Sequence, residues 1–348
     1  MSTSSSAVLV AGGAGYIGSH TAKVLKHAGL EPIVLDNLST GNRFALRFGP
    51  FYEGSLGDAP LLRRIIDTHR PQGAILFAGH IEVGESTVNP RKYFRNNVTE
   101  ALAFLDTALD AGLHAVVFSS SCAVYGPQAK MPLSEDNPTD PASPYAETKL
   151  AVEKILRWYG SAYGLRSASL RYFNAAGADP DGEIGEHHPG ESHLIPLAIR
   201  AALGDQASGG KSLRVFGTDY PTPDGTAIRD YVHVMDLADA HLRSLRYLVD
   251  GGESVTLNLG TGQGHSVREV IQAVERAAGC AVPVEYGPRR AGDVPALVAD
   301  ASKARQVLGW VPKYPELETI VGTAWRWHNR IGTQPTTGNR SARVDILS

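Results

Sequence analysis

Four glycines within seven residues separate an apolar run from a stretch with helical periodicity near the start of the chain. The stretch reads AGGAGYIGSH over residues 11–20, and AVLV at residues 7–10 comes before it. Glycine loses more backbone freedom on folding than any other residue, so ordering such a cluster is costly. Between a strand and a helix, glycines permit a tight turn and a close approach of the backbone to a ligand.

Apolar runs rich in Val, Ile, Leu and Phe alternate with segments long enough for crossover helices through the first half of the chain. Continuous apolar strands with helices between them predict a parallel sheet covered on both faces, an α/β doubly wound, Rossmann-like fold. The predicted strands are 7–11, 32–36, 73–79, 115–121 and 167–173, and the predicted helices are 16–28, 59–69, 93–111 and 144–163.

The alternation ends near residue 174, where a segment rich in glycine and proline begins. We predict one domain over residues 1–174 and a smaller α/β domain over residues 175–348. The sequence leaves open whether elements of the second domain return to the first sheet. The polar ends, 1–6 and 331–348, are expected to be mobile.

The glycine stretch fits the turn that holds the diphosphate of a dinucleotide. Residues 13–18 satisfy Gly-x-Gly-x-x-Gly, and Gly12, Gly15 and Gly18 satisfy a second spacing within the same residues. The first glycines permit the tight turn and the next one lets the backbone approach a pyrophosphate at the helix N-terminus. Gly18 lets the helix and the strand pack closely.

Asp36 ends the second predicted strand, where a carboxylate can hold the hydroxyls of an adenosine ribose. The same carboxylate repels a 2′-phosphate, and the next residues, Asn37, Leu38 and Ser39, offer no arginine to receive one. The sequence therefore predicts NAD rather than NADP as the cofactor.

A tyrosine and a lysine one helical turn apart lie in the stretch SPYAETK. Ser143 suits the N-cap and Pro144 the first helical position, so Tyr145 and Lys149 share one helix face. An ammonium beside a phenol favours the phenolate, and a positive nicotinamide adds to that effect. We therefore expect a pKa for Tyr145 below its usual value of about 10, which makes Tyr145 a candidate general base.

The predicted strand before this helix ends in Ser119, Ser120 and Ser121, at the edge where such sheets bind ligands. Ser121 is the candidate to hydrogen-bond the hydroxyl that reacts. The other two serines are interpreted as a polar strand exit or a helix cap.

The composition argues against several classes of protein. With 33 basic and 36 acidic residues the net charge is −3, so no overall field favours nucleic acid or an acidic membrane. The two cysteines, Cys122 and Cys280, fit a reducing compartment rather than a disulfide framework. No signal peptide is recognisable and no apolar run approaches the roughly 18 residues of a membrane span, so we expect a cytoplasmic protein.

Together the motifs resemble the UDP-glucose 4-epimerase (UDP-galactose 4-epimerase) family of extended short-chain dehydrogenases/reductases. They include GGAGYIGSH, DNLS, VGES, FSSSCAVYG, SPYAETK, LRYFNAAGA, RDYVH, NLGTG and GPRRAGD, and the resemblance runs from about residue 8 to 328. It implies that a hydride passes from C4 of the hexose to NAD, that the 4-keto sugar rotates, and that the hydride returns to the other face. It also implies a homodimer, with residues 1–174 binding NAD and residues 175–348 binding the UDP-sugar.

The resemblance also implies roles for individual residues. Tyr145 is the base, Lys149 its pKa partner and ribose ligand, and Ser121 the hydrogen-bonding helper. Two arginines on the substrate side also suit a diphosphate by charge and geometry. The implied cofactor positions are Gly12, Gly15, Tyr16, Ile17, Gly18, Asp36, Asn37, Leu38, Ser39, Ser55, Leu56, Phe77, Ala78, Gly79, Asn97, Ser121, Tyr145, Lys149 and Phe173. The implied substrate positions are Ser121, Tyr145, Tyr172, Asn174, His193, Leu194, Phe216, Arg229, Arg290, Asp293 and Leu297.

Four positions depart from the family pattern. Ser55 stands where many members have an aspartate near the adenine, and Ile81 where a lysine often reaches the cofactor. His193 replaces a frequent asparagine and Leu297 a frequent tyrosine at the sugar pocket. These changes bear on cofactor affinity and substrate range and leave the Tyr/Lys/Ser set intact.

The histidine pair His187 and His188, with Glu186 and Glu191 nearby, raises the question of a metal site. The residues lack the closed ligand spacing of such a site and the chemistry needs no metal. We therefore expect a solvated loop and no metal.

Three other functions compete with this interpretation. A sugar-nucleotide 4,6-dehydratase needs an acid/base pair at the positions of Cys122 and Ala123, which cannot supply it. A non-catalytic NAD-binding regulator should have a broken Tyr/Lys pair, and this chain has an intact one. A pentose 4-epimerase acting on UDP-xylose and UDP-arabinose uses the same residues and stays open.

Overall fold

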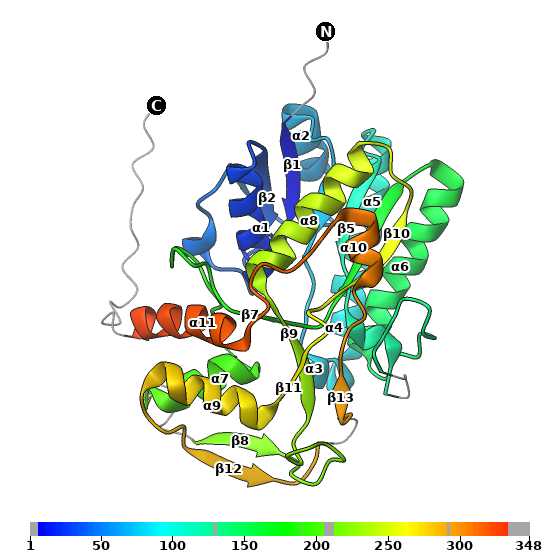
Figure 1. Ribbon diagram of the computed structural model, residues 1–348. Coiled ribbons are helices and arrows are strands. Elements are labelled where there is room, and N and C mark those ends of the chain that lie inside the picture. The colour runs from blue at the N-terminus through cyan, green and yellow to red at the C-terminus, as the bar shows by residue number, and fades with distance from the viewer. Residues whose placement is uncertain (1–5, 128–130, 189, 205–211, 291–292, 333–348) are drawn as a thin grey trace.

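Seven parallel strands form the central sheet of the protein, in the spatial order β10-β6-β5-β4-β1-β2-β3 (Figure 1). The computed structural model describes residues 6–127, 131–188, 190–204, 212–290 and 293–332. The strands are β1 (Ala7–Ala11), β2 (Glu31–Asp36), β3 (Phe51–Glu53), β4 (Ala74–Leu76), β5 (Ala115–Ser119), β6 (Arg166–Tyr172) and β10 (Val255–Leu259).

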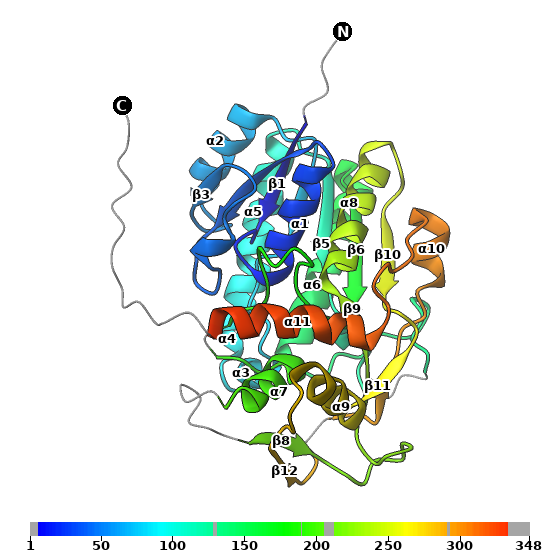
Figure 2. The same cartoon turned by 60° about the vertical axis from the view of Figure 1, so that its left-hand side comes forward.

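Helices cover both faces of this sheet (Figure 2). Strand β1 shows why its sequence is apolar throughout: Leu9 faces a core with α2, α5 and α6, whereas Val8 and Val10 face a core with α1, α8 and α10. The helices are α1 (Tyr16–His27), α2 (Ala59–His69), α5 (Glu100–Asp110), α6 (Pro144–Tyr163), α8 (Val234–Val249) and α10 (Ser302–Leu308).

Most of the chain after residue 174 builds a second, smaller layer below the carboxyl edge of the sheet (Figure 1). Its helices pack on two small sheets around a core that contains Ile199, Val274 and Ile320. The four-stranded sheet consists of β7 (Asn174–Ala176), β9 (Ile228–His233), β11 (Gly264–Ser266) and β13 (Ala296–Leu297), and the two-stranded sheet of β8 (Leu213–Phe216) and β12 (Val284–Gly287). The helices are α7 (Leu194–Ala202), α9 (Val267–Ala278) and α11 (Leu317–Gly332).

The fold class predicted from the sequence is confirmed. Two strands of the large sheet were not predicted. The strand β3 has only three residues, and β10 lies late in the chain, where it pairs with β6 in register Val255 to Ala168. The elements α8, β10 and α10 therefore return to the first sheet. The sequence had left open whether any element after residue 174 does so. The division at residue 174 stays a prediction.

The predicted helix 93–111 is not one regular helix. It is built from α4 (Pro90–Tyr93), a π-helical segment (Phe94–Thr99) and α5. A π-helical segment inside a helix shifts the direction of the side chains that follow, and such segments are frequent at functional sites. A short helix, α3 (Val83–Val88), precedes it.

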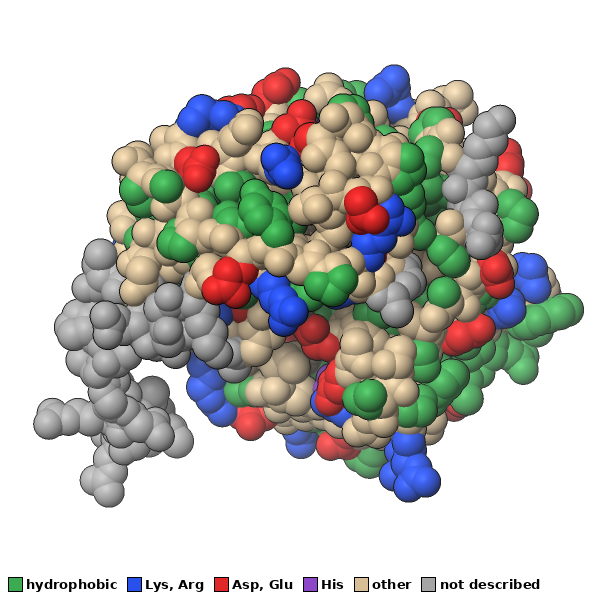
Figure 3. Space-filling view, turned by 90° about the horizontal axis from the view of Figure 1, so that it is seen from below, with side chains coloured by type: hydrophobic (Ala, Val, Ile, Leu, Met, Phe, Trp, Pro, Cys, Tyr) green, Lys and Arg blue, Asp and Glu red, His purple; other side chains and the backbone are tan. Residues whose placement is uncertain are grey.

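The surface agrees with the charge balance of the sequence. On the face seen from below, Lys and Arg side chains are interspersed with Asp and Glu (Figure 3). Within the described part of the chain, no helix is long and apolar enough to span a bilayer. The predicted mobile ends fall outside the described residues, except for residues 6, 331 and 332.

Candidate active site

A cavity of about 500 Å³ opens at the carboxyl edge of the large sheet, the position where parallel α/β sheets bind ligands. Loops that follow six of its strands contribute to the lining. The predicted site residues that line the cavity are Gly12, Gly15, Tyr16, Ile17, Gly18, Asp36, Asn37, Ser39, Ser55, Leu56, Phe77, Ala78, Gly79, Ser121, Tyr145, Lys149, Tyr172, Phe173, Asn174 and His193.

The glycine turn is as tight as its sequence predicts. Gly12 has a φ of +85°, and a Cβ added there would lie 2.5 Å from the backbone nitrogen of Ala78. A Cβ on Gly18 would lie 2.3 Å from the carbonyl oxygen of Gly12. Gly15 is the N-cap of α1 and provides no side-chain cap, so amides at the start of the helix are left for a ligand.

Asp36 ends β2 and faces the glycine turn. Its Oδ2 accepts a hydrogen bond of 2.9 Å from the Ala14 amide, and its Oδ1 accepts one of 2.8 Å from the Leu38 amide. Burial raises the pKa of Asp36, and these two hydrogen bonds counteract that rise. Each oxygen keeps accepting capacity for a ribose hydroxyl. The glycine cradle, the open helix start and this carboxylate together fit NAD.

Tyr145 and Lys149 lie on one face of α6, as the spacing predicts. Ser143 caps the helix through a bond of 3.3 Å from the Ala146 amide. Lys149 is 3% exposed, and its Nζ donates a hydrogen bond of 2.8 Å to the Ser119 carbonyl. The same Nζ lies 5.9 Å from the centroid of the Tyr145 ring.

The ionisation of this pair differs from the expectation. Burial raises the pKa of Tyr145 well above its usual value, and the hydrogen bond with Ser121 lowers it only partly. Burial also lowers the pKa of Lys149 to about 8. Desolvation is the largest influence on the pKa of Tyr145, and the Lys149 ammonium is directed at the Ser119 carbonyl.

The three serines at the carboxyl end of β5 have separate partners. Ser121 caps the short 3-10 helix Cys122–Tyr125 through a bond of 3.2 Å from the Ala123 amide and also lies beside the Tyr145 phenol. Ser120 donates a hydrogen bond of 2.5 Å to Glu153. The Ser119 hydroxyl is hydrogen-bonded to the Tyr172 hydroxyl. Ser121 is therefore a helix cap that also lies next to the candidate base, and its role toward the reacting hydroxyl stays a prediction.

Asn97 is a positioning residue in the π-helical segment. Its side chain accepts a bond of 2.8 Å from the His80 amide and donates bonds of 3.0 Å to the His80 carbonyl and 3.1 Å to the Thr148 hydroxyl. These bonds tie the loop after β4 to α6, next to Lys149. The π-helical segment thus places a residue that joins two walls of the cavity.

A second group of predicted site residues gathers around β9 and β13. Arg229 pairs with Asp293 at 3.6 Å, and Arg290 pairs with the same carboxylate at 3.2 Å. The Arg290 guanidinium lies 4.7 Å from the centroid of the Phe216 ring. The neighbouring Asp230 is not paired with Arg229, and its carboxylate accepts from the Thr261 and Gly262 amides and the Thr261 hydroxyl.

The described residues that line the cavity do not include this second group. Leu297 lies on β13 opposite Arg229 and packs against a buried cluster that contains Phe173. Leu194 begins α7 and packs on the core of the second layer. The predicted residues outside the cavity lining are Leu38, Asn97, Leu194, Phe216, Arg229, Arg290, Asp293 and Leu297.

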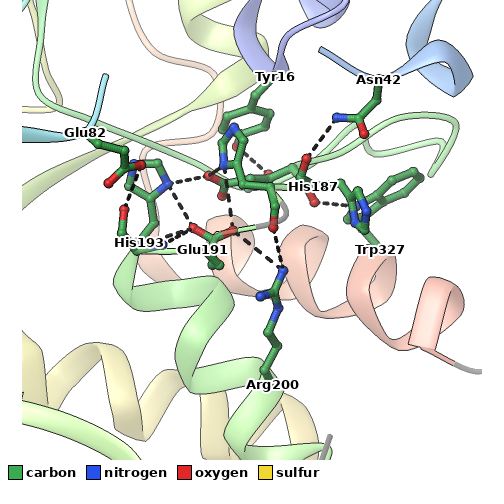
Figure 4. A network of polar contacts seen from close by, with 12 residues as sticks. Tyr16, Asn42, Glu82, His187, Glu191, His193, Arg200 and Trp327 are labelled. Carbon is green, nitrogen blue, oxygen red and sulfur yellow. Dashed lines mark hydrogen bonds and ion pairs between the residues drawn. The ribbon is translucent and has the colours of Figure 1, made fainter. Parts of the chain in front are cut away.

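The expectation of a solvated loop is wrong for the two glutamates, whereas His187 is exposed. Glu186 is 3% exposed and the side chain of Glu191 is fully buried. His193 donates a bond of 2.6 Å to Glu186, and the Nδ1 of His188 lies 3.3 Å from the same carboxylate. The backbone carbonyls of residues 186–188 accept hydrogen bonds from the side chains of Trp327, Asn42 and Arg200 (Figure 4).

Hydrogen bonds with Glu186 and Glu191 outweigh burial and raise the pKa of both histidines, to about 9 for His188 and well above its usual value for His193. Two cations therefore balance two buried carboxylates at neutral pH. The four side chains place their ligating atoms within 4.8 Å of one another, a spacing that such ion pairing explains. The absence of a metal stays a prediction.

The cavity also contains residues that the sequence did not single out. Two of them had a local signal: Asn96 precedes the predicted Asn97, and Glu85 belongs to the VGES motif. Gly54 and Glu100 had none, because the short strand β3 was not recognised. The additional lining residues are Leu35, Thr40, Gly41, Gly54, His80, Glu82, Glu85, Lys92, Tyr93, Asn96, Glu100, Ala175 and Gly190. Ile81, Ser119 and His188, which the sequence analysis discussed without placing them in a cofactor or substrate site, line the cavity as well.

Comparison with known proteins agrees with this geometry. The model described as the NAD dependent epimerase/dehydratase family matches residues 8–260, and the chain belongs to that family. It is similar to UDP-glucose 4-epimerases. The Rhizobium meliloti enzyme of that name is 50% identical over 323 residues, which cover 93% of this chain and 97% of the relative.

Solved structures lead to the same group. A UDP-glucose 4-epimerase from Brucella ovis in complex with NAD is 48% identical, has a TM-score of 0.89 and is matched over 92% of this chain and 97% of its own. One from Bifidobacterium longum in complex with NAD+ and UDP is 37% identical, with a TM-score of 0.87 over 93% of this chain and 98% of its own. The family resemblance, an enzyme of the epimerase class and NAD as its cofactor are confirmed.

The buried ion pairs at residues 186–193 predict a pH-dependent stability. The pKa of His188 in the folded protein lies above the unfolded value of 6.5. The ion pairs of protonated His188 therefore contribute fully to the free energy of unfolding below pH 6.5, and this contribution is lost as the pH rises through about 9. The full contribution is at most about 3 kcal/mol. Thermal unfolding of the wild type should therefore shift to lower temperature between these pH values, and His188→Gln should flatten that shift. His114→Gln, an exposed control, should keep the wild-type profile, and an unchanged profile in His188→Gln would contradict the assignment.

Proposed function

We propose that this protein interconverts UDP-glucose and UDP-galactose by transient oxidation at C4, with Tyr145 as the base. The observation that carries the proposal is the placement of Tyr145, Lys149 and Ser121 along one wall of a cavity that also contains the glycine turn and Asp36. A non-catalytic NAD-binding protein has no need to bury an intact Tyr/Lys pair beside its cofactor.

Tyr145 takes the proton of the C4 hydroxyl as the C4–H bond breaks, and it returns a proton to that oxygen when the hydride comes back to the other face. NAD, when bound, supplies the hydride acceptor and the positive charge of its nicotinamide ring. That charge favours a phenolate at Tyr145 in a site where burial alone disfavours one. Ser121 holds the reacting hydroxyl toward Tyr145.

Arg229 and Arg290 are the proposed partners of the substrate diphosphate. Both guanidinium groups contact Asp293, whose single charge leaves the group with a net positive charge. Arginine donates in a fork that matches phosphate oxygens. Phe216, whose ring lies beside the Arg290 guanidinium, is a further proposed contact of the UDP group.

We also propose the cytoplasmic location and the homodimer that the resemblance implies. On α6, Trp158 and Tyr163 expose 65% and 62% of their surface, which a second copy of the chain would cover. A pentose 4-epimerase remains the alternative function. The deciding experiment is incubation with UDP-glucose, UDP-galactose, UDP-xylose and UDP-arabinose, followed by chromatographic separation of the C4 epimers.

Replacing Tyr145 should abolish the reaction. Tyr145→Phe keeps the ring and removes the proton acceptor, and positioned acid/base groups contribute on the order of 10²–10⁴-fold to a rate. We expect kcat to fall by at least that factor in the hexose assay. Tyr163→Phe, on the exposed side of the same helix, is the matched control and should turn over normally. Near-normal turnover of Tyr145→Phe would remove the residue from the mechanism.

The purified protein should already contain NAD. A 4-keto intermediate requires that its hydride acceptor stay bound, and the glycine turn with Asp36 supplies the contacts. Acid precipitation should release an adenine nucleotide with an ultraviolet absorbance that approaches one equivalent per chain. A supernatant without nucleotide, together with activity that depends wholly on added NAD, would contradict this expectation.

Leu297 should influence acceptance of an N-acetyl group on the sugar. Leucine is shorter than the tyrosine frequent in the family, and one such change in a pocket is worth roughly 1–3 kcal/mol of discrimination. We expect slow but detectable turnover of UDP-N-acetylglucosamine by the wild type, suppressed in Leu297→Tyr. If the two activities keep the same ratio in Leu297→Tyr, Leu297 does not control this choice.

A further inference from the structure

The carboxylate of Glu100 enters the cavity at a position to which neither the motifs nor the resemblance assign a role. Glu100 is the first residue of α5 and lines the cavity together with Gly54, Ser55 and Leu56. The Ser55 hydroxyl donates a hydrogen bond to its Oε2, and the Gly57 amide donates another of 2.7 Å to the same oxygen. A side chain far away in the sequence thus completes the loop after β3.

This part of the cavity lies beyond the ribose position, on the side away from the catalytic residues. Asp36 and Glu53 are paired at the ends of β2 and β3, and the Gly54 amide donates a bond of 3.1 Å to the Asp36 carbonyl. Tyr145 and Lys149 lie toward β5, on the other side of β1 and β4. A dinucleotide whose adenosine ribose is held by Asp36 must therefore place its adenine against residues 54–56.

The sequence departs from the family at this position. Many members have an aspartate where this chain has Ser55, so a carboxylate is missing from the loop itself. The Ser55 hydroxyl gives its one hydrogen to Glu100, which orients the carboxylate in the loop. Both hydrogen bonds end on Oε2, and among the described residues none ends on Oε1. That oxygen is available to accept from a ligand.

We propose that Glu100 recognises the adenine of the cofactor, with its carboxylate accepting a hydrogen bond from the exocyclic amino group. The carboxylate that the loop lost at residue 55 is supplied from α5. The π-helical segment Phe94–Thr99 leads directly into Glu100, so one irregular helix provides both Asn97 and Glu100 to the cavity region. The proposal depends on NAD binding and not on the identity of the sugar.

The preference for NAD over its hypoxanthine analogue distinguishes recognition of the adenine by Glu100 from a purely structural role of Glu100 in the loop after β3. A carboxylate can only accept hydrogen bonds, which suits the 6-amino group of adenine and opposes the 6-oxo group of hypoxanthine. A glutamine amide at the same place can turn its NH2 group toward a 6-oxo group. A residue that only closes the loop after β3 would change the affinity for both dinucleotides equally.

The test is equilibrium competition on the intact holoenzyme. The protein is incubated with a fixed mixture of NAD and its hypoxanthine analogue until the bound ratio is constant. Free nucleotide is then removed, and the bound bases are released by acid and quantified by chromatography. The ratio of bound to free nucleotides gives the selectivity without any measurement of turnover. Glu100→Gln removes the proposed acceptor, and Ser55→Ala removes its hydrogen-bond partner but keeps the carboxylate. Glu53→Gln is the matched control, because it removes an exposed carboxylate that is paired with Arg43.

We expect the wild type to prefer NAD on the order of 10- to 100-fold, the range of one hydrogen bond to a charged group. Glu53→Gln should keep that ratio, Ser55→Ala should lower it modestly, and Glu100→Gln should bring it close to one or reverse it. If Glu100→Gln does not fold, Glu100→Asp, whose carboxylate is one methylene shorter, should lower the ratio several-fold.

An equal preference in the wild type, or the wild-type ratio in Glu100→Gln, would overturn the proposal. Failure of the wild type to bind either dinucleotide would overturn both this proposal and the cofactor role on which the proposed function depends. The expected selectivity in a protein without epimerase activity would leave the role of Glu100 standing and refute only the proposed reaction.

Discussion

The close approach of three backbone segments at the glycine turn is the constraint on which the rest of the site depends. A Cβ on Gly12 or Gly18 would overlap the backbone of Ala78 or of Gly12 itself. Only glycine lets α1 start directly at the edge of the sheet. Because α1 starts there, the Ala14 amide reaches Asp36, and the open amides of the helix face the cavity.

The same helix anchors the second layer of the protein. The Tyr16 hydroxyl donates a bond of 2.6 Å to the Gly177 carbonyl. The buried ammonium of Lys23 lies 2.7 Å from Asp179, 2.9 Å from Asp181 and 3.0 Å from Glu183. Removing one partner of a buried charge leaves the other uncompensated, so these contacts fix the segment 177–183 against α1. The segment that begins the second layer is thereby held next to the cofactor turn.

Burial controls the ionisation of Tyr145 and Lys149 on the wall of the cavity formed by α6. Burial disfavours both charged forms, the phenolate of Tyr145 and the ammonium of Lys149. The negative charge of nearby Glu153 acts in the other direction and raises the pKa of Lys149. Glu153 is itself paired with the buried Arg171 at 2.5 Å and accepts from Ser120. The strand end that carries Ser121 is therefore tied to α6 through charged hydrogen bonds. Under the proposed function, the positive nicotinamide ring is what would favour the phenolate of Tyr145 in this buried position.

The sequence by itself determined the parallel sheet, the glycine turn, the Asp36 position and the shared helix face of Tyr145 and Lys149. These features follow from local patterns: apolar runs, glycine spacing and a helical period that relates neighbours along the chain. The tertiary structure alone decided the contributions that come from distant segments. It put β10 beside β6, brought Glu100 to the loop that contains Ser55, and buried Glu186 and Glu191 among histidines in a segment whose composition had predicted a solvated loop. It also buried Tyr145, and this burial raises the pKa of the phenol and opposes the lowering expected from Lys149 and the nicotinamide, because desolvation depends on how many atoms surround a group and one-dimensional spacing does not encode that number.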